Sequence, residues 1–175
     1  MQTAPQAAPR NRWLKPLAIV IVIAALATAA FFSLYAKASA PNVAFTDLTG
    51  KKVTMSDLRG KVVMVNFWAT SCVTCIKEMP AFIETYNKYN EKGLDFIAVA
   101  MSYDPPNYVL NYAKTRQLPF RVTLDTQGEL AKAFGDVQLT PTTFVIDKRG
   151  NIIKRYIGEP ELAELYKLLE DALAA

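Results

Sequence analysis

The chain has 175 residues, a length typical of one domain, and its 51% hydrophobic and 21% charged residues are ordinary for a globular protein. Of its 20 Lys and Arg residues, four lie within the first 37 positions, whereas all 16 acidic residues come later, so basic and acidic residues balance from Ala38 onward. The formal net charge of +4 therefore arises at the N-terminus, which excludes a basic nucleic-acid-binding surface as its explanation.

Two segments with contrasting compositions open the chain. Residues 1–16 are a leader rich in Ala, Gln and Pro, and residues 17–36 form an apolar run without one charge. Twenty helical residues are enough to cross a bilayer core of ~30 Å. Positive residues tend to stay in the cytoplasm, and three of them come just before the run: Arg10, Arg12 and Lys15. The sequence thus predicts a single-pass anchor in the cytoplasmic membrane, in contact with lipid, with the later residues in an extracytoplasmic space.

A cleaved secretory signal is the alternative for the apolar run. Small-residue triplets at 36–38 and 38–40 resemble cleavage sites. However, the run is longer than the ~7–15 residues of a signal core, and Pro41 is a poor residue just after the second triplet. These observations favour an anchor that is retained, although both alternatives place the later residues outside the cytoplasm.

After a short link at 37–42, strand and helix patterns alternate through residues 43–175. A hairpin is expected from Phe45 to Thr54, with Gly50 near its turn. Nearly continuous apolar runs predict buried strands, and apolar residues at three- and four-residue spacing predict helices. The predicted strands are 61–68, 96–101, 122–124, 143–147 and 152–157, and the predicted helices are 72–91, 106–116, 128–134 and 160–174. This alternation indicates an α/β domain with a central mixed sheet flanked by helices.

The only two cysteines, Cys72 and Cys75, lie where a predicted strand gives way to a predicted helix. Structural zinc requires about four ligands, and the chain has no histidine to supply the others. Heme attachment would need histidine where Ile76 stands. A purely structural disulfide would close a very small loop and so constrain the unfolded chain little. We therefore expect no metal and no cofactor at these cysteines.

A redox function fits the same two cysteines better. Cys72 is expected at the helix N-terminus, where unpaired N–H groups and the helix dipole stabilise a thiolate, the form of cysteine that attacks disulfides. Cys75, one turn further along, is expected to be more buried and to resolve the mixed disulfide by attacking Cys72. This position thus predicts a nucleophile that needs no histidine.

Several longer motifs resemble those of the thioredoxin superfamily. From Pro41 onward the chain is similar to the membrane-anchored TlpA/ResA-like thiol-disulfide oxidoreductases, through KVVMVNFWATSC, IKEMP after the second cysteine, VTLDTQGELAKAFGD and TPTTFVIDKRG. The resemblance implies a thioredoxin-like fold, a redox-active Cys72–Cys75 disulfide and an activity as a protein thiol-disulfide oxidoreductase. Two residues depart from the common pattern: Ser71 replaces a tryptophan, and Thr74 replaces a proline and retains a backbone N–H.

The resemblance also implies roles for residues outside the cysteine pair. Thioredoxins proper carry a buried aspartate where this chain has Asn66, which cannot titrate. The TlpA/ResA-like group instead places a glutamate three residues after the second cysteine. Glu78 occupies that position, so it is expected to transfer protons, the alternative being an ordinary solvated helix glutamate. Pro141 is expected to form a cis peptide bond, and Thr140 to offer its backbone to an extended substrate.

Three further residues complete the predicted substrate-binding set. Val73 and Thr74 form the dipeptide between the cysteines, and Trp68 ends the preceding strand. For Trp68, packing in the core or at its rim is favoured over a role in catalysis.

The predicted activity is the reduction of protein disulfides, for example in cytochrome c or copper-site maturation. The resemblance implies exported protein substrates, such as apocytochrome c or copper-site proteins, and a membrane thiol-electron transporter as the electron donor. One alternative is a general disulfide oxidase or isomerase, but the helical insertion and the histidine that such proteins usually carry are absent from the sequence. Another is a non-catalytic copper carrier, against which the lack of histidine argues.

Overall fold

The computed structural model describes residues 19–28 and 38–175, and the chain divides into two units between Ala36 and Lys37. Residues 19–28 form a helix whose apolar side chains are exposed. The remainder of the predicted anchor at 17–36, and the predicted leader at 1–16, lie outside the described residues. Among the residues that are described, no helix combines the length and the apolarity that crossing a membrane requires.

The second unit contains every strand that the sequence predicts, with boundaries that move by a few residues at most. Its strands are β1 (Ala44–Thr46), β2 (Lys52–Thr54), β3 (Val62–Trp68), β4 (Leu94–Ala100), β5 (Arg121–Leu124), β6 (Thr142–Ile146) and β7 (Ile152–Ile157). Its helices are α2 (Val73–Tyr89), α3 (Pro106–Thr115), α4 (Glu129–Ala133) and α5 (Leu162–Ala174), with two 3₁₀ helices, η1 (Met55–Leu58) and η2 (Asn90–Lys92). The 3₁₀ helix η1 was not predicted, although Thr54 and Asp57 form a capping box that marks its start.

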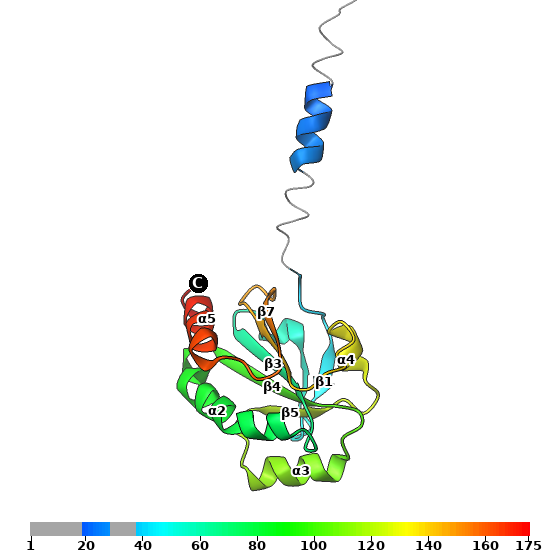
Figure 1. Cartoon of the computed structure of the whole chain (residues 1–175), viewed down its shortest axis with the longest axis vertical. Helices are drawn as coiled ribbons and strands as arrows, with labels where there is room; N and C mark the ends of the chain where they lie inside the picture. Colours follow the sequence, from blue (N-terminus) through cyan, green and yellow to red (C-terminus); the bar gives the residue numbers. More distant parts are fainter. Residues whose placement is uncertain (1–18, 29–37) are drawn as a thin grey trace, which may run out of the picture. The chain divides into compact units, whose positions relative to one another are not determined.

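Five strands form one mixed sheet in the order β5-β4-β3-β6-β7 (Figure 1). The strands β3, β4 and β5 are parallel, β6 is antiparallel to β3, and β7 is antiparallel to β6. The strands β1 and β2 pair separately as the predicted hairpin. β3 is the middle strand of the five and is buried on both faces. The residues that follow its carboxyl end therefore lie at the centre of the side of the sheet where the strand ends meet the loops.

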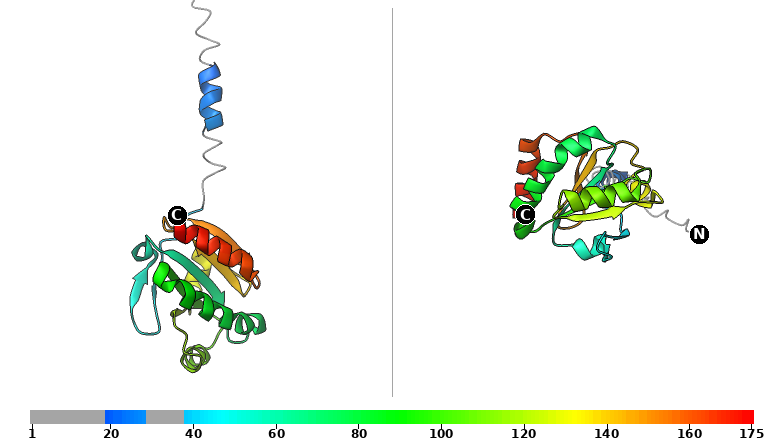
Figure 2. Two further views of the ribbon diagram at one scale, coloured as in Figure 1. Left: turned by 90° about the vertical axis from the view of Figure 1, so that its left-hand side faces the viewer. Right: turned by 90° about the horizontal axis from the view of Figure 1, so that it is seen from below.

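Alternate residues of β3 enter two different apolar cores, as the period of a strand requires. Met64 and Trp68 pack on the face covered by α2 and α5, with Val109 of α3 in the same core. Val63, Val65 and Phe67 pack on the opposite face, toward α4 and the β1–β2 hairpin. Figure 2 shows the sheet and the helices that flank it from two further directions. Asn66 shares its parity with Met64 and Trp68, so its amide points to the face that carries α2.

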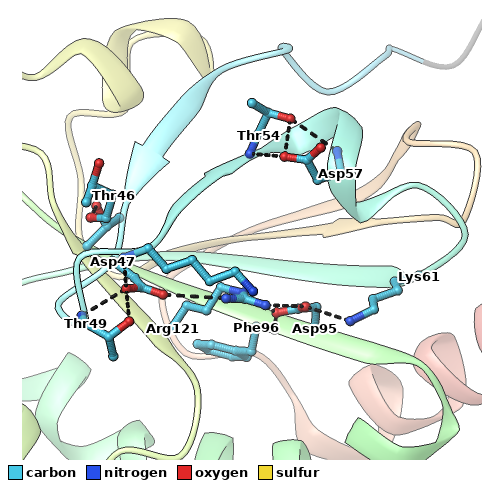
Figure 3. Close-up of polar contacts among 11 residues, drawn as sticks. Thr46, Asp47, Thr49, Thr54, Asp57, Lys61, Asp95, Phe96 and Arg121 are labelled. Carbon is cyan, nitrogen blue, oxygen red and sulfur yellow. Dashed lines mark hydrogen bonds and ion pairs between the residues drawn. The ribbon is translucent and has the colours of Figure 1, made fainter.

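A chain of charged side chains attaches the N-terminal hairpin to the edge of the sheet. Arg121 of β5 lies 3.5 Å from Asp47 Oδ2 and 3.2 Å from Asp95 Oδ1, and Lys61 Nζ lies 3.1 Å from Asp95 Oδ2 (Figure 3). Both carboxylates are buried and accept further hydrogen bonds, including one from the backbone of Thr49. The ion pairs thus hold the hairpin against β4 and β5, away from the cysteines.

The predicted link also contributes to the fold. Ala40 N–H donates to the carbonyl of Gly150 over 2.9 Å, and Ile152 N–H donates to the carbonyl of Ala38 over 2.8 Å. These bonds place residues 38–40 against the turn between β6 and β7.

Candidate active site

The two cysteines lie at the strand-to-helix transition that the sequence predicts. β3 ends at Trp68, and Cys72 is the N-cap of α2 with an extended backbone conformation. The backbone N–H of Cys75 donates to Cys72 Sγ over 3.2 Å. Cys72 Sγ therefore accepts one of the N–H groups that a helix start leaves unpaired, an arrangement that also stabilises a thiolate on this atom.

Cys72 and Cys75 form a disulfide, with their Cα atoms 5.2 Å apart. Cys72 is half-buried, whereas Cys75 is completely buried. An external thiol or disulfide therefore has access to Cys72 only. This asymmetry suits an attacking cysteine at position 72 and a resolving cysteine at position 75.

The loop before Cys72 is fastened by Asp104, a residue that sequence reasoning missed. The Asp104 carboxylate accepts hydrogen bonds from the backbone N–H of Thr70, over 2.6 Å, and from its hydroxyl, over 2.5 Å. Asp104 is buried, so these bonds fix the loop two residues before Cys72. An aspartate that directly follows a buried strand and its turn is the sequence signal that could have drawn attention to it.

Glu78 is buried at 3% exposure, one helical turn after Cys75 on the same face of α2. Its Oε1 accepts a hydrogen bond from Asn66 Nδ2 over 3.3 Å, and Asn66 Nδ2 also donates to Thr143 Oγ1 over 3.0 Å. Two buried oxygens, Asn66 Oδ1 and Glu78 Oε2, have no hydrogen-bond partner among the residues that the structure describes. Burial thus places the Glu78 carboxyl group in the core, one helical turn from Cys75.

Burial raises the pKa of Glu78 to about 8, because desolvation penalises the carboxylate. The hydrogen bond from Asn66 acts in the opposite direction, and the negative charge of Glu159 adds to the rise. Glu159 follows β7 and forms an ion pair with Lys77 over 2.9 Å. A carboxyl group with this pKa can both take up and release a proton near neutral pH. The environment of Glu78 therefore differs from that of an ordinary solvated helix glutamate.

Thr140 and Pro141 are joined by a cis peptide bond, and Pro141 is buried. Thr142 pairs with Phe67 in the β3–β6 register, so Pro141 lies level with the end of β3, at the sheet edge where the loop to Cys72 begins. Thr140 is half-buried just before it. The register thus brings the cysteine segment and the proline segment to one edge.

The residues between the cysteines are exposed, as a substrate contact requires: Val73 retains 83% of its accessible surface, and Thr74 is also exposed. Trp68, in contrast, is completely buried, with its ring 5.3 Å from that of Tyr112. This burial corrects the expectation that Trp68 contacts substrate, because its position on β3 turns the indole into the core that lies under α2. The packing in the core that the sequence analysis favours over a catalytic role describes Trp68.

Tyr103 and Thr143 also belong to the site but were not predicted. Tyr103 OH lies 3.2 Å from Thr140 Oγ1, and Thr143 is the partner of Asn66. Both contacts join segments far apart in the sequence, so only the sheet register could have indicated them. Within residues 19–28 and 38–175, no three His, Cys, Asp or Glu side chains are arranged to hold a metal ion.

Comparison with known proteins agrees with this geometry. Residues 35–169 match the Redoxin family. The chain is 43% identical over 131 residues to the thiol-disulfide oxidoreductase ResA of Bacillus thuringiensis subsp. konkukian, covering 75% of each chain. It is 37% identical over 119 residues to ResA of Bacillus subtilis, covering 68% of this chain and 65% of the relative.

The solved structures agree as well. A thiol:disulfide interchange protein of the thioredoxin family from Chlorobium tepidum has 30% identity and a TM-score of 0.72, over 79% of this chain and 97% of that one. StoA from Bacillus subtilis has 25% identity and a TM-score of 0.64, over 74% and 97% of the two chains. The chain therefore belongs to the redoxin family, and it is a ResA-like protein thiol-disulfide oxidoreductase with a thioredoxin-like fold.

Proposed function

We propose that this protein reduces disulfides in exported proteins, with Cys72 as the attacking thiol, Cys75 as the resolving thiol and Glu78 as the group that carries the proton of Cys75. The observation that supports this most is the burial of Glu78 one turn after Cys75, with one carboxyl oxygen that accepts no hydrogen bond from the described part of the chain. A solvated glutamate would remain ionised at neutral pH and could not hold a proton for the thiol.

The reaction is written for the reduced protein and a substrate disulfide. The Cys72 thiolate attacks one substrate sulfur, a mixed disulfide forms, and the other substrate sulfur leaves as a thiolate that is then protonated. The Cys75 thiol loses its proton to the Glu78 carboxylate and attacks Cys72 Sγ. The Cys72–Cys75 disulfide forms and the first substrate sulfur leaves. Two electrons have then moved from the protein to the substrate.

Regeneration reverses the direction of the proton. One thiolate of a donor dithiol attacks Cys72 Sγ and releases the Cys75 thiolate, which takes the proton from Glu78. The second donor thiol then attacks the first donor sulfur, the donor disulfide forms, and Cys72 leaves as a thiolate. With the disulfide formed, the pKa of Glu78 is raised to about 8, so the carboxyl is protonated at neutral pH and ready to donate. The same proton thus passes between Glu78 and Cys75 in each cycle.

We further propose that residues 17–36 anchor the protein in the cytoplasmic membrane with the catalytic domain outside. The uncharged run, the basic residues before it and the exposed apolar side chains of helix 19–28 support this location. The substrate class is then an exported cysteine pair that must stay reduced, as in apocytochrome c or a copper site. A thiol-electron transporter in the same membrane is the corresponding electron donor.

Two measurements in cells test the proposal. The steady-state redox form, trapped with a maleimide, is expected to be the dithiol, because a reductase is kept reduced by its donor; a fully oxidised pool would instead indicate an oxidase. The Cys75→Ser variant should accumulate mixed disulfides through Cys72, and mass spectrometry should identify exported proteins with cysteine pairs. Recovery of the same adducts from Cys72→Ser would contradict the assignment of the attacking thiol.

A further inference from the structure

The loop between β4 and α3 contacts both segments that border the disulfide. Asp104 holds Thr70, two residues before Cys72, and the neighbouring Tyr103 places its hydroxyl 3.2 Å from Thr140 Oγ1. Because Asp104 is 5% exposed and makes two short hydrogen bonds, the backbone next to Tyr103 is fixed. The backbone that carries the exposed Tyr103 side chain is therefore held in place by the hydrogen bonds of Asp104.

The Tyr103 side chain is 56% exposed. Three more of the exposed large apolar side chains in residues 38–175 lie along the same segments: Val73 follows Cys72, Leu139 precedes Thr140, and Ile157 pairs with Thr142. The N–H of Gly158, next to Ile157, donates to the carbonyl of Pro141 over 2.8 Å. Four of the seven exposed large apolar side chains in residues 38–175 thus lie on segments that adjoin the disulfide or the Thr140–Pro141 peptide bond, as expected of an interaction surface.

We propose that Tyr103 is a specificity-determining residue that contacts an apolar or aromatic side chain next to the disulfide of an extended polypeptide substrate. The inference rests on the proposed function and adds the chemical class of the residues that flank the substrate disulfide. The contact with Thr140 supplies the geometry, because a chain that pairs with the backbone of Thr140 must pass beside the ring of Tyr103.

The physical reason for a tyrosine here is its rigid, amphipathic ring. A tyrosine offers a large contact area with only two side-chain torsions to immobilise, so little conformational entropy is lost on binding. The hydroxyl contact with Thr140 holds the ring beside the proposed substrate path. Binding energy from this contact acts on substrate affinity and not on sulfur chemistry, so the KM of a peptide is the sensitive quantity.

The test uses the full-length protein in detergent, with dithiothreitol as electron donor and two synthetic peptides that contain an intramolecular Cys-Ala-Ala-Cys disulfide. One peptide has phenylalanine on both sides of the cysteine pair, and the other has serine. The small disulfide 5,5′-dithiobis(2-nitrobenzoate), added to the pre-reduced protein after removal of dithiothreitol, reports the chemistry of Cys72 in a single turnover. The variants are Tyr103→Ala, Tyr103→Phe and the matched control Tyr108→Ala, which removes a tyrosine of similar exposure, 59%, from α3.

Tyr103→Ala is expected to raise the KM of the phenylalanine peptide about tenfold, with little change in kcat, in the KM of the serine peptide or in the rate with the small disulfide. Tyr103→Phe keeps the ring but loses the hydroxyl contact with Thr140, so it should raise the KM of the phenylalanine peptide less than Tyr103→Ala does. Tyr108→Ala should stay close to the wild type. Equal KM ratios for the two peptides in wild type and Tyr103→Ala would overturn the inference, as would an equal loss with all three disulfides. A wild-type protein that turns over the small disulfide but neither peptide would overturn the proposed function itself.

Discussion

Asn66 donates a hydrogen bond to the buried carboxyl of Glu78, with 3.3 Å between Asn66 Nδ2 and Glu78 Oε1. This bond joins the central strand β3 to α2, the helix that begins at the cysteines. Asn66 is neutral at every pH, whereas Glu78 can bind or release a proton. The pair therefore places one titratable group, one helical turn from Cys75, in an apolar core.

Replacing Asn66 with alanine should raise the pKa of Glu78 further above its ordinary value. The hydrogen bond from Asn66 lowers that pKa, so its loss leaves desolvation unopposed. Nuclear magnetic resonance titration of the ¹³C-labelled Glu78 carboxyl measures the change. Thr143→Val is the matched control, because it removes the second acceptor of Asn66 and keeps the bond to Glu78. A fall in the pKa of Glu78 in Asn66→Ala would contradict this account.

The raised pKa of Glu78 also predicts how stability depends on pH. Between the ordinary value of 4.5 and about 8, the folded protein holds a proton that the unfolded chain has lost, so the free energy of unfolding falls as the pH rises. Glu78→Gln removes this dependence. From pH 5 to pH 8.5, the oxidised wild type should lose roughly 3–5 kcal/mol more stability than the variant, at ~1.4 kcal/mol per pKa unit. Parallel stability curves from urea unfolding would rule out a raised pKa.

Arg121→Met should destabilise the fold by about 3 kcal/mol and leave the alkylation of Cys72 unchanged. The substitution leaves the buried carboxylates of Asp47 and Asp95 without their shared cation. Urea unfolding measures the loss. As a control, Lys167→Met breaks an exposed ion pair with Asp171 and should cost less than about 1 kcal/mol. If both substitutions lowered the free energy of unfolding by the same small amount, the buried network would contribute no more stability than an exposed ion pair.

In the reduced protein, the thiol pKa of Cys72 should lie below the ordinary value of ~8.5, because Cys72 is the N-cap of α2 and its sulfur accepts the N–H of Cys75. The rate of iodoacetamide alkylation against pH measures this pKa. Cys75 should react far more slowly, since it is completely buried. Faster reaction of Cys75, or an inflection at or above the ordinary value, would reverse the proposed roles.

The sequence predicts the strands and helices well because their signals are local. The apolar run of β3 and the spacing of Met79 and Phe82 in α2 follow from the period of each element. The face of Trp68 was harder to predict, since a residue at the end of a strand can line either the core or the substrate surface. Only the packing of α2 on β3 decides that the indole is buried.

The cysteine pair could be predicted for the same local reason, but its surroundings could not. The position of Glu78 came from a resemblance, since a lone helix glutamate is by default solvated. Its burial depends on how α2 lies on the sheet. The contacts of Asp104 with Thr70 and of Tyr103 with Thr140 join separate loops, so no pattern within either loop indicates them.

The most direct test of the central claim follows the resolution of a mixed disulfide at Cys72 in single-turnover experiments from pH 5 to pH 9. The experiment compares the wild type with Glu78→Gln, which preserves shape and removes the proton-binding group. At neutral pH the variant should resolve the mixed disulfide at least about tenfold more slowly. Loss of general acid–base catalysis slows a reaction by up to ~10²–10⁴-fold, and water can replace part of the function of Glu78. Alkylation of Cys72 and the fold should be unchanged. Superimposable rate profiles over the whole pH range would mean that Glu78 carries no proton for Cys75.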